Sequence, residues 1–122
     1  MGSLLLVAAG GALGAACRYG AGILSAALFG RSFPVGTLLV NVAGCFIIGA
    51  VFSAVAEQAH GPLGVFLIQG FCGALTTFST FSLDSFQLLR AGRAGSAAAN
   101  VVLNMALGLG AAVLGLSLFA GA

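Results

Sequence analysis

The chain has 122 residues, of which 61% are hydrophobic and only 5% are charged. Soluble domains carry roughly 25% charged residues, so this chain has too little polar side chain to cover a surface in water, and lipid is its expected solvent. Its formal net charge is only +2, which excludes nucleic-acid binding through a basic patch.

Polar residues divide the sequence into four hydrophobic blocks, each longer than the roughly 20 residues that a helix needs to cross a bilayer. We therefore predict an all-α membrane protein with four transmembrane helices, at about residues 3–29, 35–56, 63–89 and 96–120. The connections between the blocks are too short to form a further domain. The predicted organisation is a single transmembrane domain over residues 1–122.

The predicted first helix has no basic residue ahead of its apolar stretch and runs well beyond the length of a signal-peptide core, so we expect it to be retained. Gly10 and Gly14 are four residues apart, a spacing that lets two helix backbones approach closely. Arg18 lies within this helix with no acid in the same segment. It could pair with a carboxylate of another segment, donate to carbonyl groups at a helix end, or attract anions toward a vestibule.

The predicted second helix places Thr37 and Asn41 one turn apart on the same face. A polar group inside a membrane span costs free energy unless it is paired or faces water, so such residues are candidates for function. The helix therefore carries a short polar track.

The predicted third helix contains a run of hydroxyl and aromatic residues, Thr76 to Ser82, that is unusual within a membrane span. Five hydroxyl residues within seven positions form a poor continuous helix. An unbroken helix over residues 63–89 would also be longer than the hydrocarbon core requires. We therefore predict a break near residues 73–80, because broken spans are tolerated where protein or water satisfies the freed backbone groups, and such breaks commonly coordinate ions.

The second half of this helix needs its own cap. We expect Ser79 or Thr80 to provide it and Asp84 to lie in the first turn, where a negative charge complements the helix dipole. Phe78 and Phe81 are three apart, so both rings can project from one face. Aromatic edges carry partial positive charge, so the pair could contact an anion that has shed water, although a phenylalanine pair in a membrane more often packs against lipid or the core.

The predicted fourth helix repeats the polar spacing of the second, with Asn100 and Asn104 four residues apart. An isolated asparagine in a span more often joins helices than lines a pore. Together with Asn41 and the broken third helix, however, the pair favours a polar pathway.

The arginines of the loops are distributed unevenly. Four crossings place both termini and the central loop on one side of the membrane, where the sequence has no Lys or Arg. The first and third loops lie on the other side and hold Arg31, Arg90 and Arg93. The positive-inside rule then predicts that the first and third loops face the cytoplasm.

Three stretches of the sequence together are similar to a known family. They are Gly10–Tyr19, Gly36–Phe46, and Gly70–Gly73 running into Thr76–Ser82. In this order they resemble the Fluc (CrcB) family of fluoride channels, and the likeness extends over all four helices. The last stretch is the most specific.

The resemblance implies a dimer of antiparallel subunits with two narrow fluoride pathways and a structural sodium ion (Na+) at the dimer interface. In the family, main-chain carbonyls at the third-helix break bind the sodium, and these match Gly73 and Thr76 here. The fluoride pathway is expected to include Arg18, Asn41, Phe78, Ser79, Thr80 and Phe81. The fourth helix departs from members that present a tyrosine and then serine or threonine at successive turns, so Asn100 and Asn104 are expected pathway residues on polarity alone.

The predicted function is passive, fluoride-selective efflux that reduces cytoplasmic fluoride, without covalent chemistry and hence without enzyme activity. The expected location is multi-pass in the inner membrane of a bacterium. Expected partners are fluoride, lipid, and either a second antiparallel copy or a paired homologue, because three arginines on one side are a bias that a dual-topology chain should lack.

Two other classes of membrane protein share some of these features. A small dual-topology exporter of the multidrug-resistance type would also have four spans, but a proton-coupled exporter needs a membrane-embedded carboxylate, typically in the first span, where this chain has Arg18. A non-conducting membrane subunit would use the polar tracks as packing devices only.

Overall fold

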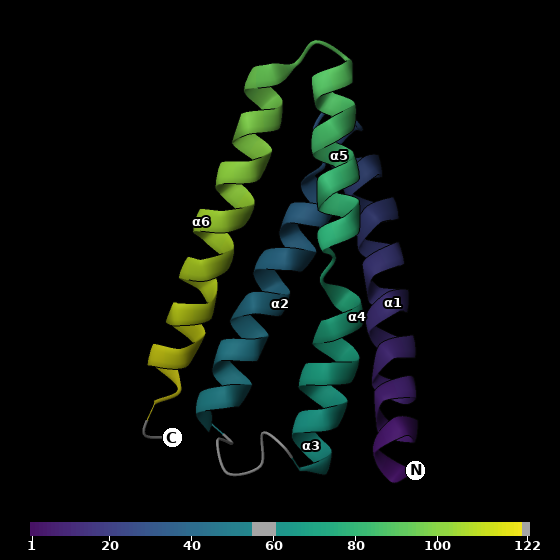
Figure 1. Ribbon diagram of the computed structural model, residues 1–122, viewed down its shortest axis with the longest axis vertical. Helices are drawn as coiled ribbons and strands as arrows, with labels where there is room; N and C mark the ends of the chain where they lie inside the picture. The colour runs from purple at the N-terminus through teal and green to yellow at the C-terminus, as the bar shows by residue number, and fades with distance from the viewer. Residues whose placement is uncertain (55–60, 121–122) are drawn as a thin grey trace.

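The computed structural model describes residues 1–54 and 61–120, and all the regular structure within them is helical (Figure 1). The elements are α1 (Gly2–Phe29), α2 (Val35–Ala54), α3 (Pro62–Gly64), η2 (Val65–Cys72), α4 (Gly73–Leu75), α5 (Phe78–Arg90) and α6 (Ala94–Leu118). The short helix α3, the π-helical stretch η2 and α4 follow one another without a gap.

Four segments are long and apolar enough to cross a membrane, which confirms the four predicted spans. They are α1, α2, the segment Pro62–Arg90 and α6. The predicted last two residues of the second helix, 55 and 56, lie outside the described residues.

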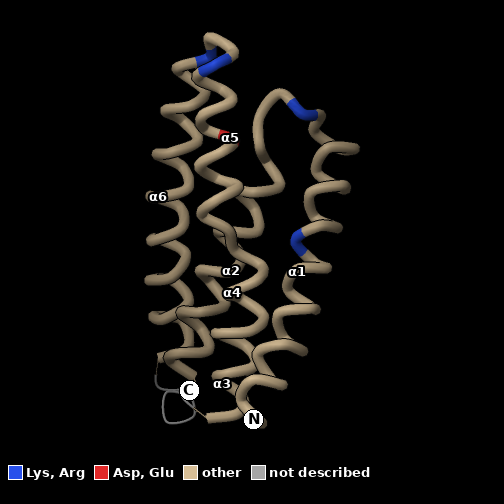
Figure 2. The backbone as a smooth tube through the Cα atoms, turned by 45° about the vertical axis from the view of Figure 1, so that its right-hand side comes forward, with Lys and Arg blue, Asp and Glu red and all other residues tan. Residues whose placement is uncertain are grey.

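The spans run alternately up and down, so the two ends of the bundle differ. The N-terminus, the last turn of α6 and α3 lie at one end, and the connections between α1 and α2 and between α5 and α6 lie at the other (Figure 1). The loop arginines gather at this second end (Figure 2), while Arg18 lies within α1. Arg93 joins the two connections by donating to the carbonyl of Ser32, and its other terminal nitrogen donates to Ser96 Oγ at 3.2 Å.

Close backbone contacts hold the spans together. A Cβ atom at Gly10 would overlap the carbonyl oxygen of Phe66, and one at Gly14 would overlap that of Phe71. Both glycines therefore let α1 lie directly against η2, as their spacing predicted. Gly49 and Gly115 do the same for α2 and α6, since a Cβ at either position would meet the facing backbone.

The segment Pro62–Arg90 changes its packing partner along its length. Its first half, η2 and α4, packs mainly against α1, whereas its second half, α5, packs mainly against α6. Helix α2 contacts both halves and packs along α6. The change of partner falls between Leu75 and Phe78, at the start of the hydroxyl run Thr76–Ser82.

Most large apolar side chains point away from the bundle. Leu4 is 66% exposed and Leu109 70%, while Val40, Leu75 and Leu88 are among the few large apolar residues that are buried. Lipid is therefore the expected surrounding of the outer surface. Because lipid is as apolar as these side chains, helix association depends on the small-residue contacts and on polar bonds between helices.

Candidate functional site: the interrupted third span and its cleft

Two extended residues separate α4 from α5. Thr76 has φ −81° and ψ 155°, and Thr77 has φ −154° and ψ 119°, so neither continues a helix. Thr76 still bonds backward, because its amide and its hydroxyl both donate to the carbonyl of Cys72, at 3.0 Å and 2.9 Å. The chain thus leaves helical geometry over two residues in the middle of the segment.

The cap of α5 is Thr77, not Ser79 or Thr80 as the sequence analysis expected. Its extended backbone places Oγ1 to accept from the amide of Thr80 at 3.2 Å, the third helical position. Ser79 instead lies in the first turn, exposed, with its Oγ 3.3 Å from Thr77 Oγ1. Because the helix begins at Phe78, Asp84 falls in the second turn, and the expectation that it lies in the first turn was wrong.

Asn41 on α2 binds the interrupted backbone from the side. Its Oδ1 accepts from the amide of Thr77 at 2.8 Å, and its Nδ2 donates to the carbonyl of the same residue at 3.3 Å. Its Nδ2 also donates to Asn104 Oδ1 on α6 at 2.9 Å. One side chain therefore replaces helical partners that the break removes, and it does so from the middle of the bundle.

Arg18 meets the same region from α1. Its Nε donates to the carbonyl oxygen of Ala74 at 2.9 Å, and the residue is half-buried. This bond is one of the three roles left open by the sequence, donation to a carbonyl at a helix end. The carbonyl of Ala74 belongs to the last turn before the break, so Arg18 stabilises the end of the first half of the span.

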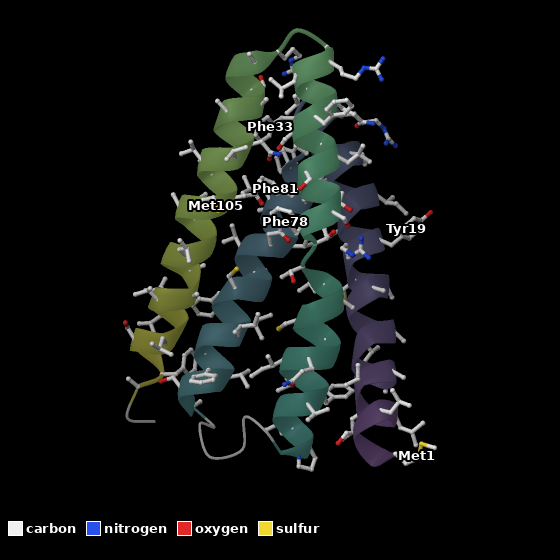
Figure 3. All side chains as sticks on the ribbon, viewed as in Figure 1. Met1, Tyr19, Phe33, Phe78, Phe81 and Met105 are labelled. Carbon is white, nitrogen blue, oxygen red and sulfur yellow. The ribbon has the colours of Figure 1, made fainter. Side chains whose placement is uncertain are left out.

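The two phenylalanines at the start of α5 contact each other. Their ring centroids are 5.6 Å apart with planes inclined at 52°, and Figure 3 shows both at mid-height of the bundle, beside the interruption. Their environments differ, because Phe78 is 72% exposed and Phe81 only 7%. A large aromatic ring thus stands uncovered next to the most polar stretch of the span.

A cleft of about 910 Å³ lies between α1 and α5. It extends from Arg18 and Thr77, at the level of the break, to Arg31 and Arg93 at the arginine-bearing end. Asp84 is the one acid among its lining residues, against three arginines, so the charge of the cleft is net positive. A positive, polar cleft raises the local concentration of anions at its base.

Two polar partners in this region were missed by the sequence analysis. Thr37 Oγ1 donates to Asp84 Oδ2 at 2.9 Å, and Ser85 Oγ donates to the carbonyl of Phe81 at 2.9 Å. A signal for the first was present, because Thr80 and Asp84 are four residues apart on α5 and share a helix face, and both line the cleft. No spacing in the sequence indicated the bond of Ser85.

The asparagines of α6 lie behind this site rather than on the cleft. Asn104 is half-buried and its Nδ2 donates to Asn100 Oδ1 at 3.0 Å, while Asn100 has no exposed surface. Asn100 Nδ2 donates in turn to Ser85 Oγ at 2.9 Å. The structure therefore brings the predicted residues of α2 and α6 together with the start of α5 through direct bonds.

Carbonyl oxygens are the available ligands for a cation here. Within residues 1–54 and 61–120, no group of three His, Cys, Asp or Glu side chains could hold a metal ion. At the break, the amide of Thr77 is turned to Asn41 and that of Thr80 to Thr77 Oγ1. These are the donors that a continuous helix would direct at the carbonyls of Gly73 and Thr76, so both oxygens lose their usual partners.

Comparison with known proteins places this geometry in context. A family model described as "CrcB-like protein, Camphor Resistance (CrcB)" matches residues 5–116, from the first turns of α1 to the last turn of α6. A protein of Shewanella amazonensis named fluoride-specific ion channel FluC is 50% identical over 117 residues, which are 94% of each chain.

Relatives of the same name occur in other bacteria. One from Dehalococcoides mccartyi is 46% identical over 113 residues, covering 89% of this chain and 85% of its own. One from Cereibacter sphaeroides is 46% identical over 115 residues, covering 94% and 92%. The residues that the family model matches, 5–116, include the interrupted span.

Proposed function

Since this chain belongs to the CrcB-like family, we propose that it is a fluoride-selective ion channel through which fluoride leaves the cytoplasm passively. Efflux of this kind reduces fluoride toxicity and involves no covalent step. The proposal rests on the family together with one structural observation. The third span is interrupted at the point where two phenylalanine rings, hydroxyl groups and an asparagine amide meet.

Fluoride is small and strongly hydrated, so a pathway must replace part of its water shell with donors that are already in place. The base of the cleft offers the hydroxyl of Thr80, and Ser79 and the rings of Phe78 and Phe81 lie close by on the first turn of α5. Ring edges provide weakly positive contacts that do not bind the ion too tightly to leave. The positive cleft, with Arg18 at its base, would serve as the entrance.

The remaining pathway residues come from α2 and α6. Asn41 has its donors directed at Thr77 and Asn104, next to the phenylalanine pair. Asn104 is connected to the pathway by its bond to Asn41, and Asn100 is connected to it by the bond from Asn104. Larger halides would be excluded because the donors are held by the helices and cannot spread.

We propose that the working unit contains a second chain, of the same sequence and in the antiparallel orientation or a paired homologue. In the single chain Gly73, Phe78, Ser79 and Ser82 are exposed at the middle of a membrane span. Hydroxyl groups and the carbonyl oxygens of a break are costly to expose to lipid. A partner that covers this strip removes the cost and closes the pathway around Phe78.

A sodium ion between the two chains would be held by the main-chain carbonyls of Gly73 and Thr76. The diversion of the amides of Thr77 and Thr80 to other acceptors supports this site, because it leaves the two oxygens without helical donors. Hard cations prefer oxygen ligands of this kind. The ion would neutralise oxygen dipoles that otherwise face each other across the interface.

The protein is a multi-pass membrane protein, and its relatives are bacterial. We propose that it resides in the inner membrane, where fluoride that has entered the cell must be released. If the partner is a paired homologue, the arginine-bearing end of this chain would face the cytoplasm, as the positive-inside rule favours; in an antiparallel homodimer it would do so in one of the two copies.

The chain purified alone and reconstituted in liposomes should release trapped fluoride, measured with a fluoride electrode, and should release chloride far more slowly. Release by this one chain would identify the homodimer as sufficient. Release only after a homologue from the same cell is added would identify the pair. Equal release of fluoride and chloride, or no release in either preparation, would contradict the proposed channel.

Removal of sodium should weaken the dimer, because binding of an ion to the assembled form alone stabilises that form by mass action. The chain would be prepared from lysis onward with N-methylglucamine in place of sodium, and its dimer fraction measured by light scattering after chromatography. The fraction should fall and recover when sodium is restored. An unchanged dimer fraction in a sample that elemental analysis shows to be free of sodium would exclude the site.

A further inference from the structure

A chain of hydrogen bonds connects three helices behind the phenylalanine pair. Asn41 Nδ2 donates to Asn104 Oδ1 at 2.9 Å, and Asn104 Nδ2 donates to Asn100 Oδ1 at 3.0 Å. Asn100 Nδ2 then donates to Ser85 Oγ at 2.9 Å. We call these four side chains, from α2, α6, α6 and α5, the amide chain.

Each end of the amide chain bonds to the main chain at or next to the first turn of α5. At one end the amide of Thr77 donates to Asn41 Oδ1 at 2.8 Å. At the other end Ser85 Oγ donates to the carbonyl of Phe81 at 2.9 Å. The bonds therefore leave the third span just before Phe78, pass through α2 and α6, and return to the span at Phe81.

The end groups fix the direction of every bond between them. A backbone amide can only donate and a backbone carbonyl can only accept, whereas an asparagine side chain can be turned end over end. If Asn104 were turned, two donors or two acceptors would face each other at both of its contacts. If Asn100 were turned, two donors would face each other at Asn104, and the Ser85 hydroxyl would have to leave the carbonyl of Phe81 to donate to Asn100. Each amide of the chain thus has one orientation, and that orientation points the donors of Asn41 toward Asn104 and the break.

The start of α5 depends on such contacts more than an ordinary helix does. Thr76 and Thr77 are extended, so the helix before the break does not determine where the next one begins. Phe78 is 72% exposed and contributes little packing of its own. The bonds to Thr77 and Phe81 hold the two sides of the turn that carries both rings.

Burial separates the members of the amide chain by role. None of its four side chains lines the cleft, whereas the neighbouring Thr77 and Thr80 do, and Asn100 is the one member with no exposed surface. An ion in the cleft therefore has no access to the Asn100 amide. Any effect of Asn100 on conduction must therefore come from the residues to which it is bonded.

We propose that Asn100 and Ser85 are positioning residues of the fluoride pathway. They set the place of the Phe78–Phe81 turn and the direction of the Asn41 amide, and they do not contact the ion. This inference rests on the proposed function, but the geometry that it describes can be tested without any flux measurement.

The first test observes the amide chain directly. The sequence contains only three asparagines, all of them members of the chain, so labelling with side-chain 15N-asparagine gives three NH2 pairs in a nuclear magnetic resonance spectrum of the detergent-solubilised protein. Ser85→Ala should shift the pair of Asn100 and, through the connected bonds, that of Asn104. Ser96→Ala is the matched control, because Ser96 is on α6 but bonds to Arg93 instead. Equal spectra for the two variants would overturn the proposal.

The second test measures fluoride efflux from liposomes. Ser85→Ala should slow efflux about fivefold, the factor that loss of one such bond in a buried network corresponds to. Ser85→Thr keeps the hydroxyl and should restore the rate, and Ser96→Ala should leave it unchanged. A rate for Ser85→Thr as low as that for Ser85→Ala would count against positioning by the hydroxyl.

A double-variant cycle decides whether Asn100 acts through Ser85. If it does, Asn100→Leu combined with Ser85→Ala should be no slower than the slower single variant, because removing both partners leaves neither of them unpaired. Asn104 Nδ2 keeps an acceptor in these variants, since it also donates to the main-chain carbonyl of residue 100 at 2.8 Å. Effects that multiply would mean that Asn100 acts independently of Ser85, and the proposal would be wrong. A wild-type chain that conducts no fluoride would contradict the proposed function alone, and the resonance shifts would still decide the arrangement of the amide chain.

Discussion

Phe78→Ile should reduce fluoride efflux from liposomes about tenfold while leaving the protein folded and dimeric. An aromatic edge contributes about 0.5–1.5 kcal/mol to a contact of this kind. If its loss raises the free-energy barrier to fluoride passage by about 1.4 kcal/mol, the rate falls tenfold. Isoleucine keeps an apolar side chain of similar bulk but has no positive ring edge. Folding should persist because Phe78 is 72% exposed and packs mainly against one other ring.

Phe86→Ile is the matched control. Phe86 lies on the same helix two turns further on and is 56% exposed, so the substitution removes a similar ring from a similar surface. Its efflux should match that of the wild type. If the two variants conduct alike, fluoride does not pass the ring of Phe78. Phe81→Ile is less informative alone, because that ring is buried and its loss also removes packing.

Gly44→Ala should destabilise the protein by about 1–3 kcal/mol, the usual cost of forcing an extra group into a packed site. A Cβ at Gly44 would overlap Thr76 Cγ2, whereas the next nearest atoms, at 3.7 Å and 3.9 Å, are ordinary contacts. The midpoint of thermal unfolding, followed by the loss of monodisperse protein on heating, should fall by about 5 °C or more. Efflux should also fall, because the displaced residue carries one of the proposed sodium ligands.

The specific cause can be isolated with Thr76→Ser. Serine lacks the methyl group that the new Cβ would meet but keeps the hydroxyl that donates to the carbonyl of Cys72. The double variant Gly44→Ala/Thr76→Ser should therefore regain most of the lost stability and efflux. Gly110→Ala is a control on α6, where a Cβ meets nothing within 4 Å. If the Gly44→Ala variant is as stable as this control, α2 can move away from the break and the predicted clash with Thr76 does not occur.

The helical spans and the family could be predicted from the sequence because each depends on a local pattern. Four apolar blocks longer than a bilayer requires leave little choice of architecture. Gly10 and Gly14 were recognisable as a close-approach pair from their spacing alone. The run Thr76–Ser82 is specific enough to indicate the fluoride-channel family without knowledge of any contact.

The details of the site could not be predicted because they depend on how the helices are rotated against one another. Any hydroxyl in the run could cap a helix, and Thr77 does so in a span whose break is held by Asn41 of another helix. Ser85 and Asn100 lie on neighbouring helices, and no sequence pattern joins them. The role of Arg18 was similarly open until the carbonyl of Ala74 was seen to accept from it.

The unequal ends of the bundle bear on the direction of current. A single chain presents the loop arginines to one side of the membrane and none to the other among its described residues, so a channel built from parallel copies would rectify. Two antiparallel copies present the same charges to both sides, and an ion moving inward meets the same series of potentials as one moving outward. The flow of fluoride would then be governed only by its electrochemical gradient, with no preferred direction imposed by the protein.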